Sequence, residues 1–126
     1  MKRIKRLGDA ELDIMQVIWS SDVPVNSQFV AQGLEGKRDW QLASILTVLS
    51  RLVTKGFLTC ERRGRNNYYT AIISKQEYQE AEGRQLLERV YSGSMKSLVS
   101  SLLGSKAIDK QDISELRSYL DDLEKE

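Results

Sequence analysis

Residues 40–56 read WQLASILTVLSRLVTKG, and the rest of the fold can be worked out from this segment. Apolar side chains recur in it at spacings of three and four residues, as on one side of an amphipathic helix. We expect these to face a core: Leu42, Ile45, Leu46, Leu49, Leu52 and Val53. A glycine just past the last periodic residue commonly ends a helix, so Gly56 closes it. The sequence therefore predicts a helix over residues 41–55.

The opposite side of this helix carries small polar or cationic side chains. We predict that these side chains, together with the Ala43 methyl group, contact DNA: Gln41, Ala43, Ser44, Thr47 and Arg51. Because phosphates line both walls of the major groove, a helix that enters it needs a slim face without carboxylates. No acidic residue occurs between positions 40 and 60. An ordinary solvated helix face has a similar composition, and Trp40 fits either core packing or a phosphate contact.

Two segments typical of β-strands follow, residues 57–61 and 67–73, joined by the turn RRGRN at 62–66. Three arginines within four residues favour contact with phosphates or the minor groove, although a surface turn also carries arginine for solubility. The predicted contacts of this hairpin are Arg62, Arg63, Arg65 and Asn66. A helix followed by a cationic hairpin is typical of a winged helix-turn-helix, which holds duplex DNA.

Two shorter helices precede this unit. The first is expected from Asp9 to about Ser20, and the second starts after Asn26, which is a good N-cap residue. The inward-facing residues of the second helix are expected to be Phe29, Val30 and Leu34. The basic leader at residues 2–6 fits either a DNA-contacting arm or simple solvation.

The rest of the chain is predicted to form three amphipathic helices. Ser74 and Glu77 have capping-box spacing at the start of the first, Gly104 ends the second, and Asp109 caps the third. Three short helices in 53 residues do not close a core of their own, so we expect them to dimerise. The residues expected at the dimer interface are Leu87, Val90, Leu98, Leu102, Leu116 and Leu120. The predicted fold is mainly α with a small β-hairpin: a winged-helix head (1–73) and a helical dimerisation segment (74–126).

The composition of the chain argues against several classes of function and indicates which partner its first part meets. Residues 1–73 hold 11 Lys/Arg against 7 Asp/Glu, and residues 74–126 hold 8 against 11, so a basic head precedes an acidic tail. The chain has one cysteine and no histidine, which argues against structural zinc and against histidine-based catalysis. We therefore expect no enzyme, no metal and no cofactor. A lone cysteine fits a reducing cytoplasm, and no apolar run is long enough to span a membrane.

Several short segments, spread over nearly the whole chain, resemble those of a known protein family. They are DAELDIM at 9–15, Ile18-Trp19, Trp40, RLVTKGF at 51–57, Tyr68-Tyr69, ERVYSGS at 88–94 and DISELR at 112–117. Their order and spacing resemble the penicillinase-repressor family, also called the BlaI/MecI/CopY family. The resemblance implies a homodimeric repressor that binds a palindromic operator, often beside antibiotic resistance genes. It also implies a membrane-sensor protease system that cleaves the dimerisation segment, and the aligned bond here is Ser101–Leu102.

This chain departs from the family pattern in its predicted recognition helix. Members usually begin that helix Trp-Ser-Pro-Lys-Thr and carry another basic residue further along, whereas this chain has WQLAS at 40–44 and Leu46 at the later position. The loss of two cations should weaken nonspecific phosphate binding, and Leu46 would extend the apolar stripe. The aligned cleavage pair lacks the Asn-Phe type of the β-lactam repressors, and the C-terminal cysteine cluster of the copper-sensing branch is missing.

The sequence thus predicts a cytoplasmic, dimeric, DNA-binding repressor. Two alternatives remain at this point. One is a winged-helix module that docks a protein with the same surfaces. The other is a small-molecule-responsive regulator with a pocket around Tyr78, Leu87 and Tyr91.

Overall fold

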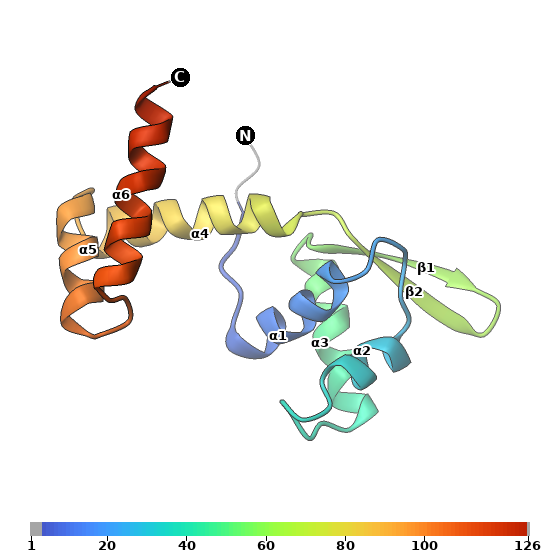
Figure 1. Cartoon of the computed structure of the whole chain (residues 1–126). Helices are drawn as coiled ribbons and strands as arrows, with labels where there is room; N and C mark the ends of the chain where they lie inside the picture. The colour runs from blue at the N-terminus through green and yellow to red at the C-terminus, as the bar shows by residue number, and fades with distance from the viewer. Residues whose placement is uncertain (1–3, 126) are drawn as a thin grey trace. The chain divides into compact units, whose positions relative to one another are not determined.

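A computed structural model describes residues 4–125 of the chain (Figure 1). Its elements are α1 (Asp9–Trp19), α2 (Ser27–Gly33), α3 (Leu42–Thr54), β1 (Leu58–Arg63), β2 (Asn66–Ala71), α4 (Lys75–Val90), α5 (Met95–Gly104) and α6 (Lys110–Glu124). They form two compact units, and the division falls between Glu82 and Gly83, inside α4. The predicted class, mainly α with one β-hairpin, is confirmed.

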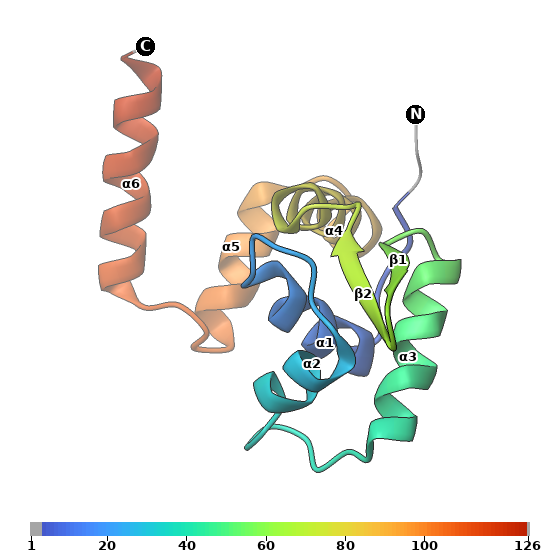
Figure 2. The same ribbon diagram turned by 90° about the vertical axis from the view of Figure 1, so that its right-hand side faces the viewer.

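The first unit, hereafter the head, is a winged helix-turn-helix. Helices α1, α2 and α3 pack around one apolar core, and the antiparallel hairpin β1–β2 extends from them (Figures 1 and 2). Asn26 caps α2 as predicted, because its Oδ1 accepts a hydrogen bond from the Phe29 amide at 2.9 Å. Val25 and Tyr69 exchange two backbone hydrogen bonds, of 3.1 and 2.7 Å, which adds a one-residue bridge beside β2.

The strands are displaced from their predicted positions. Phe57 is fully buried and its amide bonds to the Leu52 carbonyl, so it finishes the helix end instead of opening the strand. At the tip, Arg63 pairs with Asn66, and only Gly64 and Arg65 remain in the turn. Gly64 has φ +64°, a conformation that favours glycine at the first central position of a two-residue hairpin turn. The turn is therefore tighter than predicted, and β1 extends through Arg62 and Arg63.

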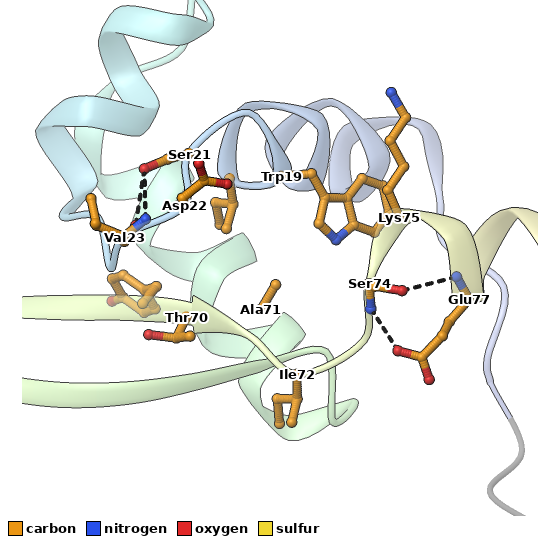
Figure 3. Close-up of a pocket in the computed structure, with 12 residues that line it drawn as sticks. Trp19, Ser21, Asp22, Val23, Thr70, Ala71, Ile72, Ser74, Lys75 and Glu77 are labelled. Atoms are coloured by element: carbon orange, nitrogen blue, oxygen red, sulfur yellow. Dashed lines mark hydrogen bonds between the residues drawn. The ribbon is translucent and has the colours of Figure 1, made fainter.

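The head extends beyond residue 73, which is the boundary predicted from the sequence. Tyr78, in the first turns of α4, is buried between the rings of Trp19 and Phe57, with ring centroids 5.9 and 5.8 Å away. Its hydroxyl accepts a hydrogen bond from the Leu7 amide and donates one to Glu82. The predicted capping box is confirmed: the Ser74 and Glu77 side chains each bond the other's amide at 3.0 Å (Figure 3).

The second unit contains the rest of α4 together with α5 and α6. Helix α4 ends where Ser92 and Gly93 adopt positive φ values of 50° and 80°. Ser94 caps α5, and Asp109 caps α6 as predicted by accepting a hydrogen bond from the Asp112 amide at 2.9 Å. Between residues 83 and 125, every described side chain is half-buried or exposed. These helices therefore leave their apolar surfaces largely uncovered.

Within the described part of the chain, no helix combines the length and the apolar character needed to cross a membrane.

Candidate nucleic-acid interface

Helix α3 lies along one side of the head, next to the hairpin (Figure 2). Its core side is formed by residues spaced as i, i+3, i+4 and i+7, namely Ile45, Val48, Leu49 and Leu52. The residues predicted to contact DNA are all exposed: Gln41, Ala43, Ser44, Thr47 and Arg51. Gln41 is the N-cap residue of α3, but its side chain makes no capping hydrogen bond, so the amide group is available to a ligand.

Two of the predicted core residues of α3 do not face the core. Leu42 is 45% exposed and Leu46 is 40% exposed, whereas Val48, which the predicted stripe omitted, is only 6% exposed. At 3.6 residues per turn, the seven large apolar residues of this helix span about 160° of its circumference, and Leu42 and Leu46 lie at one edge of that arc. Periodicity alone therefore does not predict which edge of the arc is covered by the core. Phe29 of α2 was also predicted to face inward and is 39% exposed.

Helix α1 holds the segment that precedes α3. The Arg38 guanidinium pairs with the Asp13 carboxylate of α1 and lies 5.1 Å from the centre of the Trp40 ring. Trp40 is half-buried against the core, in agreement with the packing interpretation of this residue. The Arg38 side chain is therefore engaged in contacts within the head, and these contacts hold the residues that precede α3.

Helix α1 also holds the far end of α3. Lys55, the C-cap residue, places its Nζ 2.7 Å from Oε1 of Glu11, and the Gly8 amide donates to the same oxygen at 2.8 Å. Glu11 is a buried charged residue of the head, with 4% of its surface exposed. Lys55 and Glu11 are 44 positions apart, so no local sequence signal points to this pair. It fixes the orientation of α3 beside the hairpin.

The environment of Glu11 favours its charged form. Burial by itself raises the pKa of this carboxyl, but three attractions outweigh it: the hydrogen bond from Lys55, the hydrogen bond from the Gly8 amide, and the positive charges of Lys55 and Arg51. The pKa of Glu11 is therefore lowered. Its second oxygen, Oε2, is buried without a hydrogen-bond partner among the described residues. The carboxylate thus depends strongly on Lys55.

The arginines at the tip of the hairpin, hereafter the wing, differ in the contacts that they make within the chain. All four predicted contact residues are exposed: Arg62, Arg63, Arg65 and Asn66. Arg63 pairs with Glu61 at 3.2 Å and lies 5.4 Å from the centre of the Tyr68 ring, while the Arg62 Nε donates to the Gly64 carbonyl. Within residues 4–125, Arg65 has no ion-pair or ring partner, so its charge is fully available at the turn.

The basic leader is only partly described, since Lys2 and Arg3 lie outside residues 4–125. Lys5 and Arg6 are exposed, and Arg6 forms an ion pair with Glu82 of α4 at 3.4 Å.

A hollow of about 310 Å³ opens where α1, the following turn, β2 and the start of α4 meet (Figure 3). Trp19, Asp22, Val23 and Thr70 are among the residues that line it. The Trp19 indole N–H is already bonded to the Ile73 carbonyl at 2.9 Å. Tyr78, one of the residues expected around the pocket of a small-molecule-responsive regulator, is buried in the core and does not line this hollow.

The residues predicted for dimerisation and cleavage belong to the second unit. Leu87, Leu98 and Leu102 are half-buried, and the exposed members are Val90, Leu116 and Leu120. The Ser101–Leu102 bond lies inside α5. Ser101 is exposed, and its Oγ accepts a hydrogen bond from the Tyr91 hydroxyl at 3.0 Å.

Comparisons with known proteins agree with this arrangement. The model of the penicillinase repressor family matches residues 7–122. The penicillinase repressor of Bacillus licheniformis is 34% identical over 122 residues, which cover 97% of this chain and 94% of that protein. The methicillin resistance regulatory protein MecI of Staphylococcus aureus strain N315 is 23% identical over 114 residues, covering 90% and 92%.

Two solved structures resemble the head. The solution structure of the DNA-binding domain of the repressor BlaI is 37% identical, with a TM-score of 0.53, and covers 62% of this chain and 94% of that one. The solution structure of the Bacillus licheniformis BlaI monomer in complex with the blaP half-operator is also 37% identical, with a TM-score of 0.51 and the same coverage. The chain therefore belongs to the penicillinase repressor family.

Proposed function

We propose that this protein represses transcription as a homodimer that holds a palindromic operator. The chain is a DNA-binding transcriptional repressor. In the proposed complex, α3 of each protomer enters the major groove, and the two grooves are roughly 10 base pairs apart or a multiple of that. The wings contact the flanking phosphates.

The exposed face of α3 is the observation that carries this proposal. Gln41, Ser44 and Thr47 lie on it, Arg51 adds a cation nearer its end, and carboxylates are missing from residues 40–60. A glutamine amide forms paired hydrogen bonds with adenine, and short hydroxyl side chains bond to several bases. The wing supplies Arg65 and its neighbours for phosphates, which position a protein without reading the sequence.

Dimerisation is supported by the uncovered apolar surface of the second unit. Its large exposed apolar residues are Leu86, Val90, Met95, Leu103, Leu116, Tyr119, Leu120 and Leu123. So many exposed apolar side chains on 43 described residues, none of which is buried, support an interface with a partner chain. A partner chain would also join two heads on one DNA, so the second head would bind as an intramolecular event at high effective concentration.

Derepression in this proposal is loss of the dimer through cleavage by a membrane-sensor-linked protease system. Cutting the Ser101–Leu102 bond would detach α6 together with the end of α5, and would weaken self-association. Proteases cleave extended chain, whereas this bond lies inside a helix, so α5 has to open locally before it is cut. Intact-mass spectrometry of the protein after incubation with membranes from induced cells should then find a fragment that ends at Ser101. If the chain stays intact in this incubation, although the membranes come from cells in which the target gene is expressed, this route is excluded.

The dimer can be tested independently of DNA. Replacing both Leu116 and Leu120 with aspartate should produce monomers at micromolar concentration in sedimentation velocity, because the charges would have to be buried between the protomers. Ser118→Asp is the matched control, since residue 118 lies on the opposite side of α6 and should leave the dimer intact. A wild-type protein that sediments as a monomer at this concentration would refute the proposed assembly.

DNA binding itself is tested by fluorescence anisotropy with random duplex DNA at low salt. A repressor with the proposed cationic wing binds such DNA with an affinity that falls steeply as salt rises. No binding under these conditions would favour the alternative in which the same surfaces dock a protein.

A further inference from the structure

An apolar patch lies beside the predicted DNA-contacting face of α3 and shares Ala43 and Thr47 with it. Leu42, Ala43, Leu46 and Thr47 are all exposed, and their spacings of one, three, four and five positions place them together on the first half of the helix. The two leucines keep 45% and 40% of their surface in contact with water. Single exposed leucines are common on protein surfaces, but these two adjoin the Ala43 and Thr47 methyl groups and form one continuous apolar surface, which is suited to contact with an apolar ligand group.

Thr47 contributes a methyl group to this patch. Its hydroxyl donates a hydrogen bond to the Ala43 carbonyl, with 3.0 Å between the two oxygens. Because the hydroxyl hydrogen is engaged on the helix backbone, Thr47 offers a ligand its methyl group and an acceptor lone pair. Together with the Ala43 methyl, this makes the surface around Leu46 more apolar than the sequence indicates.

The surroundings of the patch point to DNA as its partner. Gln41 and Ser44 border it with hydrogen-bonding groups, and Arg51 lies further along the helix. The thymine C5-methyl group is the apolar group that a base pair presents in the major groove, and alanine, threonine and other apolar side chains contact it there. DNA would engage both features of this surface, the apolar patch through thymine methyl groups and the neighbouring cationic wing through phosphates.

We propose that Leu42 and Leu46, with Ala43 and Thr47, recognise thymine methyl groups, so that the operator carries neighbouring T·A pairs under the first half of α3. This inference rests on the proposed insertion of α3 into the major groove, and it names the bases that the helix selects. The apolar contacts replace the hydrogen bonds that longer polar or cationic side chains would make to guanine.

The test begins with selection of bound sequences from a random duplex library by the full-length protein. In the selected duplex, each thymine is then replaced by uracil, which lacks only the C5-methyl group and keeps the same base-pairing edge. Burial of one methyl group is worth about fourfold in affinity, so each contacted thymine should lose about that factor for the wild type. For Leu46→Ala or Leu42→Ala, the uracil and thymine duplexes should bind almost equally at the contacted position.

Val23→Ala is the matched control, because Val23 is an exposed apolar residue outside α3. This variant should keep the wild-type preference for thymine over uracil, and circular dichroism should show that all variants are folded. Selection without any enriched sequence would refute the proposed function. An enriched sequence whose uracil substitutions have no effect, or have the same effect in the wild type and in both leucine variants, would overturn this inference while leaving the proposed function standing.

Discussion

Replacing Lys55 with methionine should destabilise the head strongly at neutral pH. The substitution keeps an apolar stem of similar length but removes the ammonium group that lies 2.7 Å from the Glu11 carboxylate. Glu11 then retains the Gly8 amide as a hydrogen-bond donor, and its second oxygen is already buried without a partner. Loss of one partner from a buried ion pair leaves an uncompensated charge, which typically costs about 3–5 kcal/mol.

Protonation of Glu11 limits this cost. At pH 7 a carboxyl group with an ordinary pKa of 4.5 is neutralised for about 3.4 kcal/mol, at 1.36 kcal/mol per pH unit. Since Lys55 retains 26% side-chain exposure, part of its attraction is already screened. We therefore expect the free energy of unfolding to fall by about 2–3 kcal/mol at pH 7. The assay is urea denaturation of the full chain at one fixed protein concentration, followed by circular dichroism.

The pH dependence distinguishes this explanation from a simple packing defect. The folded-state pKa of Glu11 is lowered, so its contribution to wild-type stability is present above its ordinary pKa and is lost as the pH falls through the lowered value. In the Lys55→Met variant the carboxyl protonates more easily, so the difference from the wild type should narrow steadily between pH 7 and pH 5. Adding Glu11→Gln to Lys55→Met should restore most of the stability and remove the pH dependence. A loss below about 0.5 kcal/mol at pH 7, or an equal loss at pH 5 and pH 7, would refute the reasoning.

Two further predictions concern the wing and the helix packing. Replacing Arg63 and Arg65 with alanine should weaken binding to all duplexes alike and lower the salt slope by about 2, since each phosphate contact contributes about 0.9. Arg84→Ala in α4 should leave the slope of an anisotropy titration unchanged, and an unaltered slope in the wing variant would exclude its phosphate contacts. Gly33→Ala should cost about 1–3 kcal/mol in urea denaturation, because the added Cβ would lie 2.5 Å from a methyl carbon of α1. Gly83→Ala, in open space within α4, should instead stabilise by roughly 0.5–1 kcal/mol, and equal effects at both positions would contradict this packing.

Local signals in the sequence are sufficient to predict which helices and strands form. Asn26, the Ser74–Glu77 box and Asp109 cap their helices as predicted, because an N-cap depends on a hydrogen bond within four residues of itself. The hairpin was predicted from its strand-type residues and its arginine-rich turn. Its exact ends were not, since they depend on Phe57 being drawn into the core and on the positive φ of Gly64.

The packing of α1 against α3 depends on long-range contacts, which local sequence signals do not predict. The Lys55–Glu11 and Arg38–Asp13 pairs join α1 to both ends of α3, and the partners are far apart along the chain. The orientation of Leu46 depends on which side of α3 the other helices cover. Exposure of Gln41, Ser44 and Thr47 agrees with the predicted DNA-contacting face, while their contact with bases stays a prediction.

We propose that two copies of this chain, joined through their C-terminal helices, hold one two-fold symmetric duplex. The most direct test of this proposal measures mass and affinity on the same DNA: an inverted repeat of the selected sequence and a duplex with one half-site, at equal salt. We expect two chains on the inverted repeat and binding at least 100-fold tighter than to the single half-site, because two linked heads engage together. One chain per inverted repeat, or equal affinity for the two duplexes, would contradict the proposal.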